Sequence, residues 1–307
     1  MTENSKYITI LCGEFADGYK PLTRAKFWET YHKSEKSIKK MIESGIGEVS
    51  VLLKRSGSVA FKIEELEKRG IKITTFLDEE FPKRLLRKLK DKCPPLFYYC
   101  GNTELNQYKY VGYVGSRNIE QADEIWLKKM IDKNMEKQFC LVSGGAKGID
   151  SLSTSYALER NSFAIEFLAN NLEQKIKDQN VLRNLIEGRL LLYSAVSPFA
   201  KQYRSSFVAA AMERNKFIYA QASGTVVVRS DFGKGGTWAG ATEGIRNEWS
   251  KVYVWDKKEY EGNQTLIQKG GIGLDEEGEL TKNAFKNVIR RGEDNIEYEQ
   301  RTLFDNL

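Results

Sequence analysis

Two glycine-rich stretches, each containing a lysine, have the residue types that bind phosphate. Residues 142–150 read VSGGAKGID, and residues 231–237 read DFGKGGT. Glycines let backbone amides converge on an anion, a following helix adds its dipole, and Lys147 or Lys234 adds a full charge. The first stretch is neither a Walker A loop nor a clean dinucleotide fingerprint. The pair predicts a groove lined for phosphate, and the alternative is that both are ordinary glycine-rich turns.

Two further basic stretches belong to the same prediction. Residues 114–118 read VGSRN, and Arg117 offers a planar fork of donors suited to phosphate. Arg214 and Lys216 are expected at the end of a helix, where such cations could instead only complement its dipole. Asp150 is expected to cap the helix after the first glycine-rich stretch. The candidate DNA- or phosphate-binding residues are Gly115, Ser116, Arg117, Ser143, Gly144, Gly145, Lys147, Gly148, Arg214, Asn215, Lys216, Lys234, Gly235, Gly236 and Thr237.

The sequence offers little material for a catalytic or metal site. His32 is the single histidine, and the four cysteines stand at wide, irregular spacings. We therefore expect no catalytic residue, no metal and no cofactor. The net charge of +6 and the pI near 8.9 favour a polyanionic partner. Aromatic residues such as Phe199, Tyr203 or Phe217 could stack on bases, with core packing as the alternative role.

Short apolar runs that alternate with helical stretches predict a parallel α/β sheet for the second part of the chain. Strands are expected near 109–114, 139–142, 163–167, 190–193, 224–229 and 252–255, and helices near 122–137, 151–160, 172–187, 205–214 and 238–249. The carboxyl ends of parallel strands share one edge of a sheet, so the basic stretches should meet there.

The expected domain organisation has four parts. Residues 1–92 form a helical accessory domain with a short strand near 70–76, residues 93–107 a linker, residues 108–272 a Rossmann-like DNA-binding domain, and residues 273–307 a polar tail. The apolar run 7–12 is too short for a signal peptide, and no stretch reaches transmembrane length. We expect a cytoplasmic protein that does not enter a membrane.

The stretches 114–117, 142–150 and 214–216, in this order and spacing, resemble the DprA/Smf (DNA-processing protein A) family. Similarity extends upstream through Phe81-Pro82, residues 94–98 and Gly101-Asn102, and downstream through residues 263–271. The resemblance thus covers roughly residues 70–272. It is a divergent likeness, because Lys147 stands where arginine is commoner and residues 235–237 read Gly-Gly-Thr where many members have Ser-Gly-Ser.

This resemblance implies an extended Rossmann fold that binds single-stranded DNA in a basic pocket, forms a homodimer and loads a RecA-type recombinase without catalysing a reaction. The pocket arginine would be Arg117, and the second basic contact would be Arg214 or Lys216. We expect no winged-helix domain to follow. The process served could be DNA recombination, DNA uptake or phage defence.

Two other kinds of function stay open. Residues 235–237 with Glu243 are similar to the pattern of the lysine decarboxylase-like nucleotide phosphoribohydrolases, although Glu243 lies six residues beyond Thr237 instead of two or three. A plain nucleotide or cofactor carrier is the third possibility.

The last residues contain a short motif of their own. Gln300, Leu303 and Phe304 resemble the peptide with which bacterial DNA-handling proteins dock on the sliding clamp. The alternative is that Leu303 and Phe304 pack against the rest of the chain.

Overall fold

The computed structural model describes residues 1–45, 47–201 and 203–281, which divide into two compact units. Unit 1 contains residues 1–106 and 168–207, and unit 2 contains residues 107–167 and the chain from Val208 onward. Each unit is therefore built from two separate segments of the chain. None of the described helices is both long enough and apolar enough to cross a membrane.

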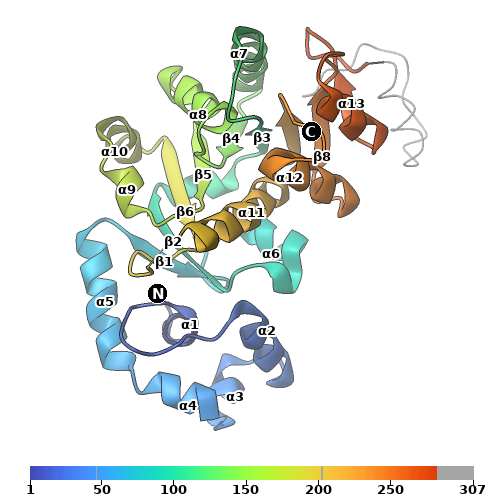
Figure 1. The fold of residues 1–307 in the computed structure, drawn as a ribbon. Coiled ribbons are helices and arrows are strands. Elements are labelled where there is room, and N and C mark those ends of the chain that lie inside the picture. Colours follow the sequence, from blue (N-terminus) through green and yellow to red (C-terminus); the bar gives the residue numbers. More distant parts are fainter. Residues whose placement is uncertain (46, 202, 282–307) are drawn as a thin grey trace. The chain divides into compact units, whose positions relative to one another are not determined.

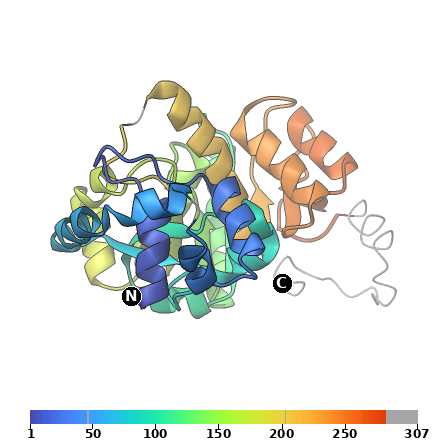
Figure 2. The same ribbon diagram turned by 90° about the horizontal axis from the view of Figure 1, so that it is seen from below.

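The first segment of unit 1 begins with a group of short helices. They are α1 (Glu3–Cys12), α2 (Arg24–Lys33), α3 (Ile38–Glu43), α4 (Gly47–Leu53) and α5 (Ser56–Lys68). Thr2, Thr23 and Ser37 cap the first three, each accepting a hydrogen bond from a backbone N–H of the first turn. Helices α1 to α4 contact one another, as both views show (Figures 1 and 2). Their buried apolar side chains form the core of this part of unit 1.

The rest of unit 1 contains three strands that pair in antiparallel fashion. Strand β2 (Leu96–Gly101) pairs with β1 (Lys72–Thr75) on one side and with β6 (Leu190–Ser194) on the other. The helices of this region are α6 (Lys83–Leu89), η1 (Lys90–Lys92), η2 (Thr103–Gln107), α9 (Glu173–Ile176) and α10 (Gln179–Ile186). The expected strand near 70–76 is confirmed. The segment expected as a linker, 93–107, instead contains a strand, because its apolar residues 96–99 are buried between two partners.

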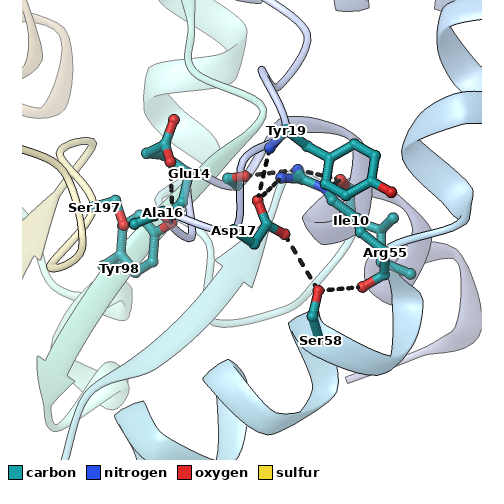
Figure 3. A network of polar contacts seen from close by, with 10 residues as sticks. Ile10, Glu14, Ala16, Asp17, Tyr19, Arg55, Ser58, Tyr98 and Ser197 are labelled. Carbon is teal, nitrogen blue, oxygen red and sulfur yellow. Dashed lines mark hydrogen bonds and ion pairs between the residues drawn. The ribbon is translucent and has the colours of Figure 1, made fainter.

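A buried arginine organises the start of unit 1 (Figure 3). The Arg55 side chain is fully buried; Nη2 donates to the carbonyl oxygen of Gly13 at 2.7 Å and Nε donates to that of Ile10 at 2.9 Å. Nη1 lies 3.3 Å from Oδ1 of Asp17. Because Ile10 lies in the last turn of α1, the guanidinium places positive charge at the negative end of that helix.

Unit 2 contains a parallel sheet whose strand order is β5-β4-β3-β7-β8-β9. The strands are β3 (Tyr110–Val114), β4 (Cys140–Ser143), β5 (Ala164–Leu168), β7 (Gly224–Val227), β8 (Lys251–Trp255) and β9 (Ile272–Leu274). From β3 the chain builds outward to β5, and β7 then starts on the other side of β3. The boundary between β3 and β7 is thus a topological switch point, where open α/β sheets form a crevice for ligands.

The helices of unit 2 connect these strands. They are α7 (Gln121–Glu136), α8 (Ile149–Glu159), α12 (Gly235–Arg246) and α13 (Glu261–Gln268), together with most of α11 (Arg204–Gln221). Helix α7 contacts α8, and α12 contacts α13 (Figure 1). Stacked indole rings of Trp126 and Trp255, 4.8 Å apart, pack α7 against β8.

The predicted fold class, a Rossmann-like parallel α/β sheet with an N-terminal helical region, is confirmed. Four details differ. The helix expected at 172–187 is divided at Asp178, whose carboxylate caps α10. The helix expected at 205–214 continues to Gln221, and the strand expected at 190–193 pairs with β2 in unit 1. Strand β9 was not anticipated.

Candidate nucleic-acid interface

Three loops meet at the carboxyl ends of neighbouring strands in unit 2. Residues 115–118 follow β3, residues 144–148 follow β4, and residues 228–234 follow β7. The last two loops lead directly into the amino ends of α8 and α12. The arrangement brings the two glycine-rich stretches and Arg117 to one edge, as the sequence predicts.

Direct contacts join these loops. The N–H of Ile149 donates to the carbonyl of Ser116 at 3.2 Å, and the hydroxyl of Thr237 donates to the carbonyl of Gly115 at 2.8 Å. Gly148 has φ of +92°, and a Cβ there would lie 2.3 Å from the Ser116 oxygen. The loop after β4 can therefore approach the loop after β3 only because residue 148 is glycine. Gly145, with φ of +63°, also occupies the left-handed region.

Asp150 and Arg214 form a buried ion pair beneath the loop after β4. Nη1 of Arg214 lies 2.8 Å from Oδ2 of Asp150, and the two side chains are 5% and 9% exposed. Burial raises the pKa of the Asp150 carboxyl, and the Arg214 guanidinium offsets part of that rise. A Cβ on Gly144 would lie 0.9 Å from Nη1 of Arg214, so this glycine makes room for the guanidinium.

The expectation that Asp150 caps α8 is wrong. The cap position is Gly148, no side chain caps there, and Asp150 lies inside the first helical turn with its carboxylate turned to Arg214. Arg214 and Lys216 are also not at a helix end, because α11 continues to Gln221. Their ion-pair partners come from other helices: Asp150 of α8 for Arg214, and Glu243 of α12 for Lys216.

The neighbours of Arg214 have structural contacts as well. The side-chain amide of Asn215 donates to the carbonyl of Gly236 at 3.0 Å, which ties α11 to the start of α12. Nζ of Lys216 lies 3.4 Å from Oε1 of Glu243, and both side chains are partly exposed. The stretch 214–216 thus holds the edge together, and Arg214 itself is not exposed.

Three predicted cations remain exposed at this edge: Arg117, Lys147 and Lys234. They come from the three different loops, and each can reach a phosphate without first losing a buried contact. Ser143 is buried, and its hydroxyl donates to the carbonyl of Tyr113 at 2.8 Å. Ser116 accepts a hydrogen bond from the N–H of Asn118, which shapes the loop around Arg117. Gly235 has φ of +79° at the start of α12.

An aromatic pair next to Lys234 was missed by the sequence analysis. Phe232 is 50% exposed, and its ring packs edge to face against the partly exposed Trp238, with centroids 5.3 Å apart. A phenylalanine in a glycine-rich polar loop was the available signal. Of the residues considered for stacking, Phe217 is buried in the core, whereas Tyr203 is 67% exposed.

The described residues contain no group of three or more histidine, cysteine, aspartate or glutamate side chains that could hold a metal ion. Glu243, the carboxylate of the enzymatic alternative, is engaged with Lys216. Gln300, Leu303 and Phe304 lie outside the described residues.

Comparison with known families decides between the candidate relationships. Residues 72–284, more than half of the chain, match the model of the family described as DNA recombination-mediator protein A. The chain belongs to this family. The expected resemblance to DprA/Smf proteins is thereby confirmed, over a region close to the one expected.

Curated family members show the same relationship at low identity. Protein Smf of Synechocystis sp. is 28% identical over 249 residues, covering 78% of this chain and 60% of that protein. DNA processing protein DprA of Streptococcus pneumoniae is 28% identical over 171 residues, covering 52% of this chain and 59% of the relative. The matched sequence spans about three-fifths of the length of these relatives.

Solved structures share the fold. The crystal structure of DprA from Streptococcus pneumoniae has a TM-score of 0.68 at 20% identity, covering 97% of this chain and 99% of the other. DprA from Helicobacter pylori, described for its single-stranded DNA binding mode, has a TM-score of 0.54 at 21% identity, covering 71% and 96%. The fold of this chain is thus a DprA fold.

Proposed function

We propose that this chain is a non-enzymatic protein that binds single-stranded DNA at the three-loop edge of unit 2 and mediates DNA recombination. Membership of the DNA recombination-mediator family supports the general role. The single-stranded DNA binding described for the Helicobacter pylori relative supports the ligand. The remaining support comes from the chemistry of the edge.

The observation that carries the proposal is the grouping of Arg117, Lys147 and Lys234 on three linked loops at the switch point of the sheet. All three are exposed, and all three follow strands whose carboxyl ends lie side by side. Cations and backbone amides at such an edge contact phosphates and carry little information about base identity. We therefore expect binding with little sequence preference.

The buried pair of Arg214 and Asp150 has a supporting role in this proposal. It fixes α11 to the start of α8, and Asn215 fixes α11 to the start of α12. The second basic contact would come from Lys216, once it leaves Glu243, and from Lys234. Arg214 positions the loops without touching DNA.

Further partners belong to the same proposal. From the family resemblance we expect a homodimer and a RecA-type recombinase as the partner. We also expect a cytoplasmic location. The process served would be recombination, DNA uptake or phage defence. Docking of Gln300, Leu303 and Phe304 on a sliding clamp is a separate expectation. A peptide of residues 296–307 should bind the clamp, and Leu303→Ala with Phe304→Ala should abolish that binding.

One titration series tests the proposed ligand. A fluorescent single strand, a duplex of the same length and a mononucleotide are each titrated with the protein, and release of free base from the mononucleotide is followed in parallel. We expect the single strand to bind tightest and no base to be released. Tight mononucleotide binding without gain from strand length would support a carrier instead, and base release would support the phosphoribohydrolase.

A further inference from the structure

The aromatic pair beside Lys234, Phe232 and Trp238, lies outside the buried core. Phe232 belongs to a loop in which Gly233 and Gly235 both adopt positive φ, +69° and +79°, and in which Asp231 and Lys234 are exposed. Half of the Phe232 side chain remains accessible although it packs on Trp238. Covering such an exposed ring with another flat apolar surface removes it from water, which lowers the free energy.

The pair is also rigidly placed within unit 2. Trp238 lies in the first turn of α12, directly after Thr237, whose hydroxyl is bonded to the carbonyl of Gly115. Gly236, one residue earlier, is bonded through its carbonyl to Asn215 of α11. The indole is therefore fixed to the loop that carries Arg117, and the Phe232 ring is oriented by the indole at an interplanar angle of 75°.

A cation beside exposed aromatic rings is the combination that binds single-stranded nucleic acids without base preference. The cation contacts a phosphate while a neighbouring base stacks on an aromatic face, and every base offers such a face. A duplex cannot use the rings, because its bases are already stacked on each other and their faces are closed.

We propose that Phe232, supported by Trp238, is a base-stacking platform that makes the three-loop edge selective for unpaired DNA. This rests on the proposed function, since the platform acts on a strand whose phosphates Arg117, Lys147 and Lys234 hold. The exposed cations supply general affinity for DNA. The aromatic pair supplies the preference for single strands over duplexes.

An abasic strand separates these two contributions, because it keeps the phosphates and lacks the bases. Wild-type protein should bind an ordinary single strand about tenfold more tightly than an abasic strand of equal length. Phe232→Ala should bind both strands with the wild-type affinity for the abasic one. Phe61→Ala, which removes a ring 75% exposed in unit 1, is the matched control and should keep the wild-type difference.

Tryptophan fluorescence gives a second readout. Trp238 is partly exposed, whereas Trp28, Trp126, Trp249 and Trp255 are buried. An ordinary strand should quench the emission of the wild-type protein and protect it from acrylamide, and an abasic strand should do neither. Trp238→Phe should retain binding and lose both signals.

The outcomes distinguish this inference from the proposed function. Equal affinity of the wild-type protein for ordinary and abasic strands, with binding intact, would overturn the platform and leave the phosphate site standing. An undiminished preference for the ordinary strand in folded Phe232→Ala would do the same. Failure of the wild-type protein to bind either strand would overturn both.

Discussion

Arg117 and Arg214 show that residues of one type, in stretches predicted to act together, have opposite environments. Arg117 is exposed after β3, whereas the Arg214 side chain is 5% exposed and paired with Asp150. An exposed guanidinium keeps its donors for a ligand. The charge of the buried Arg214 guanidinium is neutralised by Asp150, and removing the guanidinium leaves that carboxylate buried without a counter-charge. DNA binding and stability should therefore separate between the two arginines.

The first prediction concerns the exposed cations. Arg117→Ala and Lys147→Ala should each weaken single-stranded DNA binding about tenfold, because each loses a charge-assisted phosphate contact worth about 1.5 kcal/mol. Fluorescence anisotropy with a labelled strand measures the change. Lys269→Ala is the matched control, since Lys269 is exposed just before β9 and thus near the amino ends of the same strands. Wild-type affinity in the folded double variant would exclude this phosphate site.

The second prediction concerns the glycine under Arg214. Gly144→Ala should destabilise the protein by about 3 to 5 kcal/mol, because the added methyl group displaces the guanidinium from Asp150 and breaks a buried ion pair. Urea unfolding measures the loss. Gly57→Ala is the control, because a Cβ there meets nothing within 4 Å and alanine favours the helix.

Combining Gly144→Ala with Arg214→Met tests the cause. If the clash is with Arg214, the cost of Gly144→Ala should shrink in the Arg214→Met background. If the losses in unfolding free energy from the two substitutions simply add, the strain caused by Gly144→Ala does not come from Arg214.

At the scale of elements, the strands were predictable and several helix boundaries were not. The apolar runs that became β3, β4, β5, β7 and β8 are buried on both faces, which is the pattern that periodicity detects. The sequence predicts an end for α11 that is too early, because Arg214 and Lys216 are typical of a last helical turn. Their partners, Asp150 and Glu243, come from other helices and are invisible to local sequence patterns.

The candidate site was predictable to the same degree. Glycine spacing and basic residues located all three loops, because both features act locally on the backbone and its charge. Which cations stay exposed depends on tertiary pairing, so Arg117 and Arg214 could not be told apart. A role for Phe232 in binding could not be predicted, because it depends on the contact with Trp238 and on the loops beside it, which only the structure shows.

The third prediction concerns how α1 is held in unit 1. Arg55→Met should destabilise the protein by about 3 to 5 kcal/mol, since it leaves Asp17 and the carbonyls of Ile10 and Gly13 without their buried donor (Figure 3). Lys68→Met is the control, because its pair with Glu64 is exposed to solvent and such pairs contribute little to stability. Urea unfolding followed by circular dichroism compares the two, and equal losses would contradict the role given to Arg55.

At the scale of the whole molecule, the division into units does not follow the order of the chain. Residues 168–207 belong to unit 1 although sequence on both sides of them belongs to unit 2. Hydrophobic periodicity identifies a strand such as β6 but not its partner, so a contiguous Rossmann-like domain was the natural expectation. Antiparallel pairing of β6 with β2 is a long-range contact that only the structure reveals.

The net charge of +6 raises a question at this scale, namely whether DNA binding comes from three focused cations or from the general basic surface. Binding through Arg117, Lys147 and Lys234 releases about three counterions from a single strand. The logarithm of the association constant should then fall with the logarithm of salt concentration with a slope of about −2.

The fourth prediction uses two triple variants that remove the same charge. Replacing Arg117, Lys147 and Lys234 by alanine should flatten the salt dependence and abolish most of the binding, because the focused contacts are lost. Replacing the exposed Lys20, Lys54 and Lys269 by alanine lowers the net charge by the same three units and should leave the slope near about −2. Anisotropy titrations over a series of salt concentrations measure both slopes. Equal effects of the two triple variants would mean that the protein attracts DNA through its overall charge, and that the three-loop edge has no privileged role.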